Sequence, residues 1–191
     1  RPVRLAADRR RRTRRPARFS GTRQCAVCGD GKAHSQPADF DTGEGLTGPV
    51  DLKNWSAIIL AAGGSRRFGA HKLLADLAGE PVIARTVGAV CSAGFGEVIV
   101  VGGAEHDRVS AALSGLSCQT AHAADWAEGM SASIRAGVSA LEQKGEGLFL
   151  FLGDMPLVPV QLFDELATMA KASGYAARPL CGEVPGHPVA F

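Results

Sequence analysis

The chain has 191 residues, of which 46% are hydrophobic and 21% are charged, as is typical of one ordinary globular domain. No apolar run reaches the roughly 18–20 residues that a bilayer-spanning helix needs, and the arginine-rich start lacks the apolar stretch of a secretory signal. We therefore exclude membrane-spanning and disulfide-stapled classes, and the odd count of five cysteines favours a reducing, cytoplasmic compartment.

Charge divides the chain near residue 54. Residues 1–54 hold 12 Lys and Arg against 6 Asp and Glu, a formal charge of +6, whereas residues 55–191 hold 9 against 13, a formal charge of −4. The first segment also lacks any sustained apolar periodicity, so it buries too little surface to offset the entropy of ordering. We expect a basic, disordered leader over 1–54 and a folded domain over 55–191.

Beyond Trp55, short apolar runs alternate with amphipathic stretches. The patterns predict strands over 56–62, 97–101, 117–122, 147–152 and 175–180. They predict helices over 81–93, 106–113, 128–143 and 159–172. The third of these helices should bury one stripe, made of Met130, Ile134, Val138 and Leu141.

The expected strands are continuous apolar runs rather than alternations of apolar and polar residues. Such runs are typical of strands that are covered on both faces by helices. Together with the alternation of strands and helices, they predict an α/β fold: a three-layer α/β/α sandwich around a mostly parallel, Rossmann-like sheet.

Ligands of such sheets bind beyond the carboxyl ends of the strands, so the segment after the first expected strand is a candidate site. Gly63, Gly64 and Ser65 offer backbone N–H groups to an anion, and Arg67 and Lys72 add positive charge. The spacing excludes a Walker A loop, in which Gly and Lys are adjacent, and a dinucleotide fingerprint, which needs Gly where Ser65 stands. We predict a phosphate-binding loop; the alternative is an ordinary Gly-rich, charged turn.

A second candidate site follows the strongest expected strand. Asp154 comes directly after the 147–152 run and Gly153, and Pro156 follows it closely. A carboxylate in this position is well placed to hold Mg²⁺ opposite the phosphate loop. The alternative is that Asp154 caps the helix expected over 159–172.

Four segments, in order and at plausible spacing, resemble the MobA-like NTP transferase family. They are 60–72, 125–137, 152–156 and 186–191, and the resemblance covers about residues 56–191. Ala62, in place of Gly, makes the first segment most similar to the molybdenum cofactor cytidylyltransferase (MocA-like) subgroup. The resemblance implies a fold of the nucleotide-diphospho-sugar transferase type. Since family domains continue after the Gly-His-Pro element, we expect the chain to be truncated at its C-terminus.

The resemblance also implies an activity: transfer of CMP from CTP to the terminal phosphate of molybdopterin cofactor, with release of pyrophosphate and with Mg²⁺ as the cofactor. It implies that Arg67, Lys72 and Asp154 are catalytic and that Asp154 binds the metal. Substrate contacts would come from Gly129, Ser131 and His187. The nucleotide would be bound by Leu60, Ala61, Ala62, Gly63, Gly64, Ser65, Arg67 and Lys72.

Other functions stay open on these residues. A nucleotidyltransferase for a sugar phosphate or a phospho-alcohol would share the loop and Asp154. A catalytically idle fragment that binds nucleotides or polyanions is the third hypothesis, since arginine runs bind polyanions without sequence preference. The arginine-rich arm has a single aromatic residue, Phe19, which disfavours nucleic acid as a partner. A molybdoenzyme maturation partner is a further expectation.

Three residues of the leader form a possible zinc site. Cys25, Cys28 and His34 are candidate ligands, but no second Cys pair follows at zinc-ribbon spacing. The simpler interpretation is that these cysteines are incidental.

Overall fold

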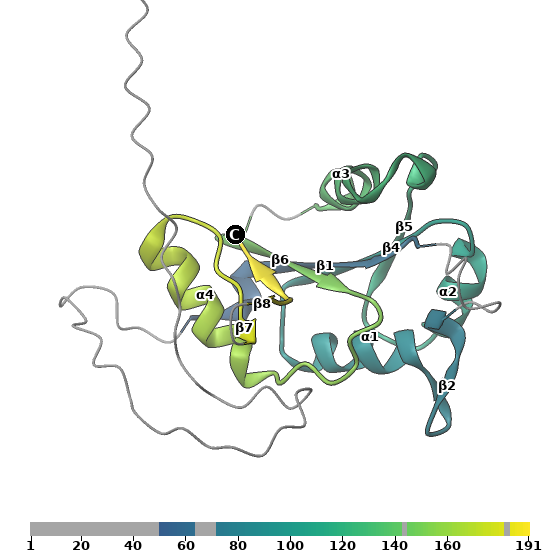
Figure 1. Ribbon diagram of the computed structural model, residues 1–191, viewed down its shortest axis with the longest axis horizontal. Coiled ribbons are helices and arrows are strands. Elements are labelled where there is room, and N and C mark those ends of the chain that lie inside the picture. The colour runs from purple at the N-terminus through teal and green to yellow at the C-terminus, as the bar shows by residue number, and fades with distance from the viewer. Residues whose placement is uncertain (1–49, 64–71, 143–144, 182–183) are drawn as a thin grey trace, which may run out of the picture.

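A five-stranded sheet lies at the centre of the computed structural model, which describes residues 50–63, 72–142, 145–181 and 184–191 (Figure 1). In spatial order its strands are β5 (Gln119–His122), β4 (Glu97–Gly102), β1 (Trp55–Ala61), β6 (Gly147–Leu152) and β9 (Val189–Ala190). Neighbouring strands from β5 to β6 are parallel, and β9 is antiparallel to β6. The predicted mostly parallel α/β fold is therefore confirmed.

The central strand β1 is buried on both of its faces. Ala57, Ile58 and Ile59 are fully inaccessible to solvent. Successive side chains of a strand point to opposite faces, so Ile58 packs into one hydrophobic cluster and its two neighbours pack into another. This two-sided burial explains why the strand is a continuous apolar run.

Helices cover the sheet on both sides, as Figure 1 shows. On one side lie α1 (Val82–Ser92), α2 (His106–Ala112) and α4 (Gln161–Ser173), and on the other lies α3 (Met130–Ala140). The larger hydrophobic cluster, with Phe149, Phe151 and Phe163, fills the three-helix side. The cluster under α3 is smaller and centres on Ile58 and Ile99. The three layers of the predicted sandwich are thus present.

The chain reverses its direction across the sheet after β5. Helices α1 and α2 carry it from β1 through β4 to the β5 edge, and α3 then returns it over the opposite face to β6, beside β1. The carboxyl ends of β1 and β6 therefore lie next to each other at the reversal. Open α/β sheets bind ligands at such a point.

Several short elements complete the described chain. Leu52, in the short helix η1 (Leu52–Asn54) that precedes β1, is 8% exposed and packs in the larger hydrophobic cluster. Packed structure therefore begins before Trp55. The other short elements are η2 (Lys72–Leu74), η3 (Trp126–Glu128) and two antiparallel pairs, β2 (Asp76–Leu77) with β3 (Glu80–Pro81) and β7 (Leu180–Cys181) with β8 (Val184–Pro185).

The third helix differs from its prediction in length and in its buried side. It spans Met130–Ala140 rather than 128–143, because Gly129, at φ 125° and ψ −176°, separates it from η3. Met130 and Val138 of the expected stripe are 58% and 48% exposed. The buried residues are the smaller Ala132, Ser133 and Gly137, which let the helix backbone approach the sheet closely.

The strand expected over 175–180 is wrong. Gly174 ends α4 in the left-handed conformation, and Ala177 then makes a single bridge to Ala190 of β9. Pro179 has no N–H group to donate, which prevents a regular ladder there. The next strand, β7, begins only at Leu180.

Membrane-crossing helices are absent from the described ranges: no helix there combines the length and the apolar character that a bilayer requires.

Candidate active site

Lys72 and Asp154 form an ion pair at the carboxyl edge of the sheet. Lys72 opens η2, and Asp154 follows β6 by two residues. The Nζ–Oδ2 distance is 2.8 Å, and the two side chains are 47% and 34% exposed. A pair this exposed stabilises the fold by at most about 1 kcal/mol, so its position is of more interest than its energy. The two candidates predicted from separate motifs thus lie in direct contact.

A pocket of about 490 Å³ lies beside this ion pair. Its lining comes from the ends of β1 and β6, from η2, and from the junction of η3 with α3. Six of the residues that the sequence singled out line it: Leu60, Ala62, Gly63, Lys72, Gly129 and Asp154. These six predicted residues are therefore brought to one concave surface.

Other predicted site residues lie elsewhere. Ala61 is 2% exposed within β1 and does not line the pocket. Ser131 is exposed and also lies outside the lining, whereas Ser133, two residues on, is 4% exposed and belongs to it. Gly64, Ser65 and Arg67 fall outside the described residues, as do Cys25, Cys28 and His34.

His187 lies toward the same edge of the sheet. It precedes β9 by two residues, and the antiparallel register of β9 on β6 directs that segment toward the carboxyl end of β6. Its Nδ1 atom is buried and has no hydrogen-bond partner within the described ranges. His187 is not part of the pocket lining, so its predicted contact with substrate stays a prediction.

Asp154 does not cap a helix. The following helix, α4, begins at Gln161, and its N-cap residue is Val160, which makes no side-chain capping bond. The capping alternative is therefore wrong, and the carboxylate is available to the pocket.

The turn that carries Asp154 is tightly held at Gly153. The Gly153 N–H donates to the Leu60 carbonyl of β1 at 2.9 Å. A Cβ atom at this position would lie 2.8 Å from Ile83 Cδ1 and 3.1 Å from the Leu60 carbonyl oxygen, so a larger residue would require the end of the Ile83 side chain to move and the Leu60 backbone to shift slightly. The carbonyl of Gly153 accepts a hydrogen bond from the Thr86 hydroxyl of α1 at 3.0 Å.

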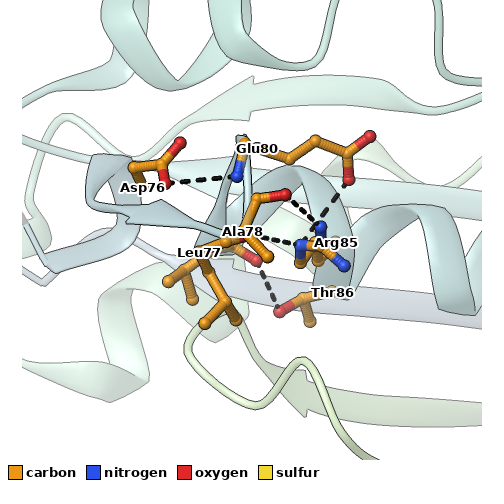
Figure 2. Close-up of polar contacts among 8 residues, drawn as sticks. Asp76, Leu77, Ala78, Glu80, Arg85 and Thr86 are labelled. Atoms are coloured by element: carbon orange, nitrogen blue, oxygen red, sulfur yellow. Dashed lines mark hydrogen bonds and ion pairs between the residues drawn. The ribbon is translucent and has the colours of Figure 1, made fainter.

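The segment that follows Lys72 is also anchored to α1. Ala78 and Gly79, at φ 53° and 89°, form the turn of the β2–β3 hairpin. Arg85 donates from Nε to the Leu77 carbonyl at 2.5 Å and from a terminal nitrogen to the Ala78 carbonyl at 2.8 Å (Figure 2). Figure 2 also shows Glu80 paired with the same guanidinium. The hairpin is thereby fastened to the helix.

Sequence reasoning missed several residues around the site. Trp126, Met130 and Ser133 line the pocket, although they belong to a segment that was recognised. Spacing along that segment could not show which serine faces inward, because the start of α3 decides it. Arg85 and Thr86 were not expected near the site, because each acts through backbone carbonyls: Arg85 through two carbonyls of the preceding hairpin, and Thr86 through the carbonyl of Gly153, 67 positions away.

A preformed metal cage is not found in the described ranges, where no three His, Cys, Asp or Glu side chains converge. Among the described residues that line the pocket, Asp154 is the one with a carboxylate. Mg²⁺ in nucleotide enzymes is commonly held by one or two carboxylates together with substrate phosphates and water. A single carboxylate beside this pocket fits this mode of binding.

Comparisons with known proteins identify the family of the chain. The profile of the MobA-like NTP transferase domain matches residues 57–191. The 2-C-methyl-D-erythritol 4-phosphate cytidylyltransferase of Parasynechococcus marenigrum is 38% identical over 124 residues, which are 62% of this chain and 54% of that protein. The bifunctional protein GlmU of Agrobacterium fabrum is 35% identical over 122 residues, which are 62% of this chain and 26% of that protein.

Solved structures show the same fold. The crystal structure of Rv0371c from Mycobacterium tuberculosis H37Rv superimposes with a TM-score of 0.61 at 26% identity, covering 72% of this chain and 70% of that one. The chain spans about half of the cytidylyltransferase and about a quarter of GlmU. Because the family profile covers well over half of the 191 residues, the chain belongs to the MobA-like NTP transferase domain family.

Proposed function

We propose that the chain is a Mg²⁺-dependent nucleotidyltransferase that transfers CMP from CTP to the terminal phosphate of molybdopterin cofactor and releases pyrophosphate. The observation that carries the proposal is the contact of Lys72 with Asp154 beside the pocket. It sets a cation suited to phosphate next to a carboxylate suited to a metal ion, at the edge where α/β sheets bind ligands.

Lys72 is the phosphate-binding group of this proposal. Its ammonium leaves Asp154 for the triphosphate and stabilises the negative charge that develops on the departing pyrophosphate. The attacking group is already an anionic phosphate, so the reaction needs no strong general base. Catalysis then consists mainly of positioning and of charge neutralisation. Arg67, in the same loop, would add a second cation.

Asp154 is the proposed metal ligand. Bound Mg²⁺ would neutralise charge on the phosphate oxygens, with Asp154 as its protein carboxylate and the nucleotide as a further source of oxygen ligands. The ion pair supports this assignment, because each residue can give up the other for a ligand of opposite charge. Lys72 would then bind the nucleotide phosphates, and Asp154 would bind the metal ion. Parting an exposed pair costs little.

The other side of the pocket suits the nucleoside. Trp126 and Met130 give it an apolar wall, while the Ser133 hydroxyl and the Gly63 backbone offer polar groups. Binding sites for small molecules commonly combine a mostly apolar lining with a few polar groups that fix orientation. We assign this wall to the base and ribose of CTP.

A second candidate is transfer to a phospho-alcohol or a sugar phosphate. It is supported by the relative that is 38% identical and is named a 2-C-methyl-D-erythritol 4-phosphate cytidylyltransferase. Both acceptors present a phosphate monoester to the same nucleotide half, so the residues described above serve either reaction. A cytoplasmic location and a molybdoenzyme maturation partner remain predictions that accompany the first candidate.

Pyrophosphate release tests both candidates. The purified chain is incubated with CTP, GTP or UTP, with or without Mg²⁺, and with molybdopterin, 2-C-methyl-D-erythritol 4-phosphate or a sugar 1-phosphate. Release that requires CTP, Mg²⁺ and molybdopterin supports the first candidate, and release with another acceptor supports the second. Release that is unchanged in Lys72→Met would contradict the assigned site for either one.

A further inference from the structure

Thr86 of α1 lies against the turn that carries Asp154. The residue is 2% exposed, which is unusual for a polar side chain. Its Oγ1 atom lies 3.0 Å from the Gly153 carbonyl oxygen and 3.1 Å from the Val82 carbonyl oxygen. A buried hydroxyl thus connects the first turns of α1 to the residue that immediately precedes the proposed metal ligand.

The hydroxyl has one proton and two acceptors within reach. Val82 is the first residue of α1, so its carbonyl also accepts within the helix by the regular i to i+4 pattern. Gly153 lies past the end of β6, where no strand ladder serves its carbonyl. The bond to Gly153 is therefore the one whose loss would leave a buried acceptor without a donor.

Further contacts at Gly153 leave the turn little freedom. Its N–H group donates to the Leu60 carbonyl, and a Cβ atom at this position would press against Ile83 Cδ1 and the Leu60 carbonyl oxygen. The Thr86 hydroxyl fixes the remaining polar group of this peptide unit. None of these contacts involves the charge of Lys72 or of Asp154.

Helix α1 also holds the segment that carries Lys72. Arg85, adjacent to Thr86, donates to the Leu77 and Ala78 carbonyls of the hairpin that follows η2, as Figure 2 shows. Two neighbouring residues of one helix therefore fasten the two segments whose charged side chains meet at the pocket. This arrangement lets the helix set the separation of Lys72 and Asp154.

We propose that Thr86 is a positioning residue, whose hydroxyl holds the Gly153 carbonyl so that the Asp154 carboxylate keeps its place when Lys72 turns to a nucleotide phosphate. The inference rests on the proposed nucleotidyltransferase function. In the structure Asp154 is held partly by Lys72. When Lys72 binds a nucleotide phosphate, its ion pair with Asp154 is lost. The hydrogen bond from Thr86 to the Gly153 carbonyl then remains to hold the turn.

Three substitutions separate this role from a general contribution to stability. Thr86→Val keeps the shape of the side chain and removes the hydroxyl, and Thr86→Ser restores the hydroxyl. Thr168→Val in α4 is the control for removing the hydroxyl of a helical threonine at an exposed position, because Thr168 donates to the Asp164 carbonyl four residues earlier. All measurements are made well below the melting temperature of each variant.

The first measurement needs no activity. Amide hydrogen exchange at Gly153 reports opening of the turn, because this N–H is bonded to Leu60. We expect Thr86→Val to speed this exchange by about tenfold, the effect of losing one buried hydrogen bond, and Thr86→Ser and Thr168→Val to leave it nearly unchanged. Exchange at wild-type rate in Thr86→Val would overturn the proposal.

The second measurement addresses the metal. CTP binding is followed by calorimetry at stepped Mg²⁺ concentrations, and pyrophosphate release is followed in parallel. Thr86→Val should raise the half-saturating Mg²⁺ concentration by about tenfold, with recovery in Thr86→Ser. An unchanged Mg²⁺ midpoint beside faster exchange would show a purely structural bond and would overturn the positioning role.

The failure of the proposed function has a separate signature. A wild-type chain without Mg²⁺-dependent CTP binding or turnover would overturn that function and, with it, the positioning role. The exchange measurement would then still decide whether Thr86 holds the turn.

Discussion

The Nζ atom of Lys72 lies 2.8 Å from the Oδ2 atom of Asp154, although 82 positions separate the two residues in the chain. The two charged groups to which we assign substrate and metal binding are thus paired with each other. Both side chains are partly exposed, so solvent screens the pair and little free energy opposes its separation. Substitution of either residue should therefore affect ligand binding far more than folding.

Replacing Lys72 with Met removes the charge and keeps most of the side-chain volume. The loss of one charge-assisted contact in the transition state costs on the order of 2.7–4 kcal/mol, so we expect kcat/KM for pyrophosphate release to fall about a hundred- to a thousandfold. The melting temperature should change little, because the ion pair is exposed. Full turnover by a folded Lys72→Met protein would rule out the phosphate-binding role.

Asp154→Asn tests the metal ligand with minimal change of shape. We expect the Mg²⁺ concentration needed for half-maximal activity to rise by at least about tenfold, because a neutral amide oxygen is a weaker ligand than a carboxylate. A titration of CTP affinity against Mg²⁺ measures this shift. An Mg²⁺ dependence in Asp154→Asn equal to that of the wild-type chain would contradict the assignment of Asp154 as a metal ligand.

Two glycines in helices should respond to alanine with opposite signs. Gly137 of α3 lies against the sheet, where a Cβ atom would come within 2.8 Å of Ile58 Cγ2 and 2.9 Å of Val101 Cγ2. We expect Gly137→Ala to destabilise the fold by about 1–3 kcal/mol through overpacking. Gly88 of α1 has nothing within 4 Å of that position. Gly88→Ala should stabilise by up to about 1 kcal/mol through helix propensity. Urea denaturation compares the two variants.

The thiol of Cys91 should react slowly with alkylating reagents. Burial, and secondarily the neighbouring Cys118, raise the pKa of Cys91 to about 11, and burial also raises the pKa of Cys118. At pH 8 the thiolate fraction of Cys91 should be more than about a hundredfold below that of an ordinary cysteine. Peptide mass spectrometry after iodoacetamide treatment measures this, with the urea-unfolded chain as the control.

The same shift has a consequence for stability. The pKa of Cys91 is higher in the folded chain than in the unfolded chain, so the unfolded chain loses its proton first as the pH rises. The free energy of unfolding should therefore decline between about pH 9 and about pH 11. Cys91→Ser should weaken this decline, and an identical alkaline profile for the variant would contradict the assignment.

The boundary of the folded domain can be tested by two deletions. We propose that the boundary lies before Leu52, because that side chain is 8% exposed within the larger cluster and its carbonyl accepts from Gly96. Removing residues 1–49 should leave the melting temperature nearly unchanged. Removing residues 1–54 should destabilise the fold by about 2–5 kcal/mol, as does Leu52→Ala, through loss of a buried leucine. Equal stability of the two deletions would return the boundary to Trp55.

Much of the fold could be predicted from the sequence because the central strands β1, β4 and β6 are largely buried. The run over 147–152 matches β6 residue for residue, and the first strand differs from β1 by one residue at each end. Patterns failed where packing depends on small residues. The third helix turns Ala132 and Gly137 to the sheet and leaves Val138 48% exposed.

The site was predictable to the level of segments. Lys72 and Asp154 were both placed at the carboxyl edge of a parallel sheet, and the structure brings them into contact. The inward-facing serine was missed, because only the start of α3 decides between Ser131 and Ser133. The role of Thr86 at the site was not predicted, because its hydroxyl bonds to a backbone carbonyl 67 positions away.

The unequal covering of the two sheet faces gives the pocket walls different mobility. Gly129, Met130 and Ser133 belong to the layer that α3 forms over the smaller cluster, whereas Lys72 and Asp154 are fastened to α1 on the side of the larger one. Elements with fewer buried apolar contacts open in native-state fluctuations at lower free energy. The α3 amides should therefore exchange through a local opening that leaves β1 and β4 protected. Such an opening would widen the pocket on its α3 side while Lys72 and Asp154 stay in place.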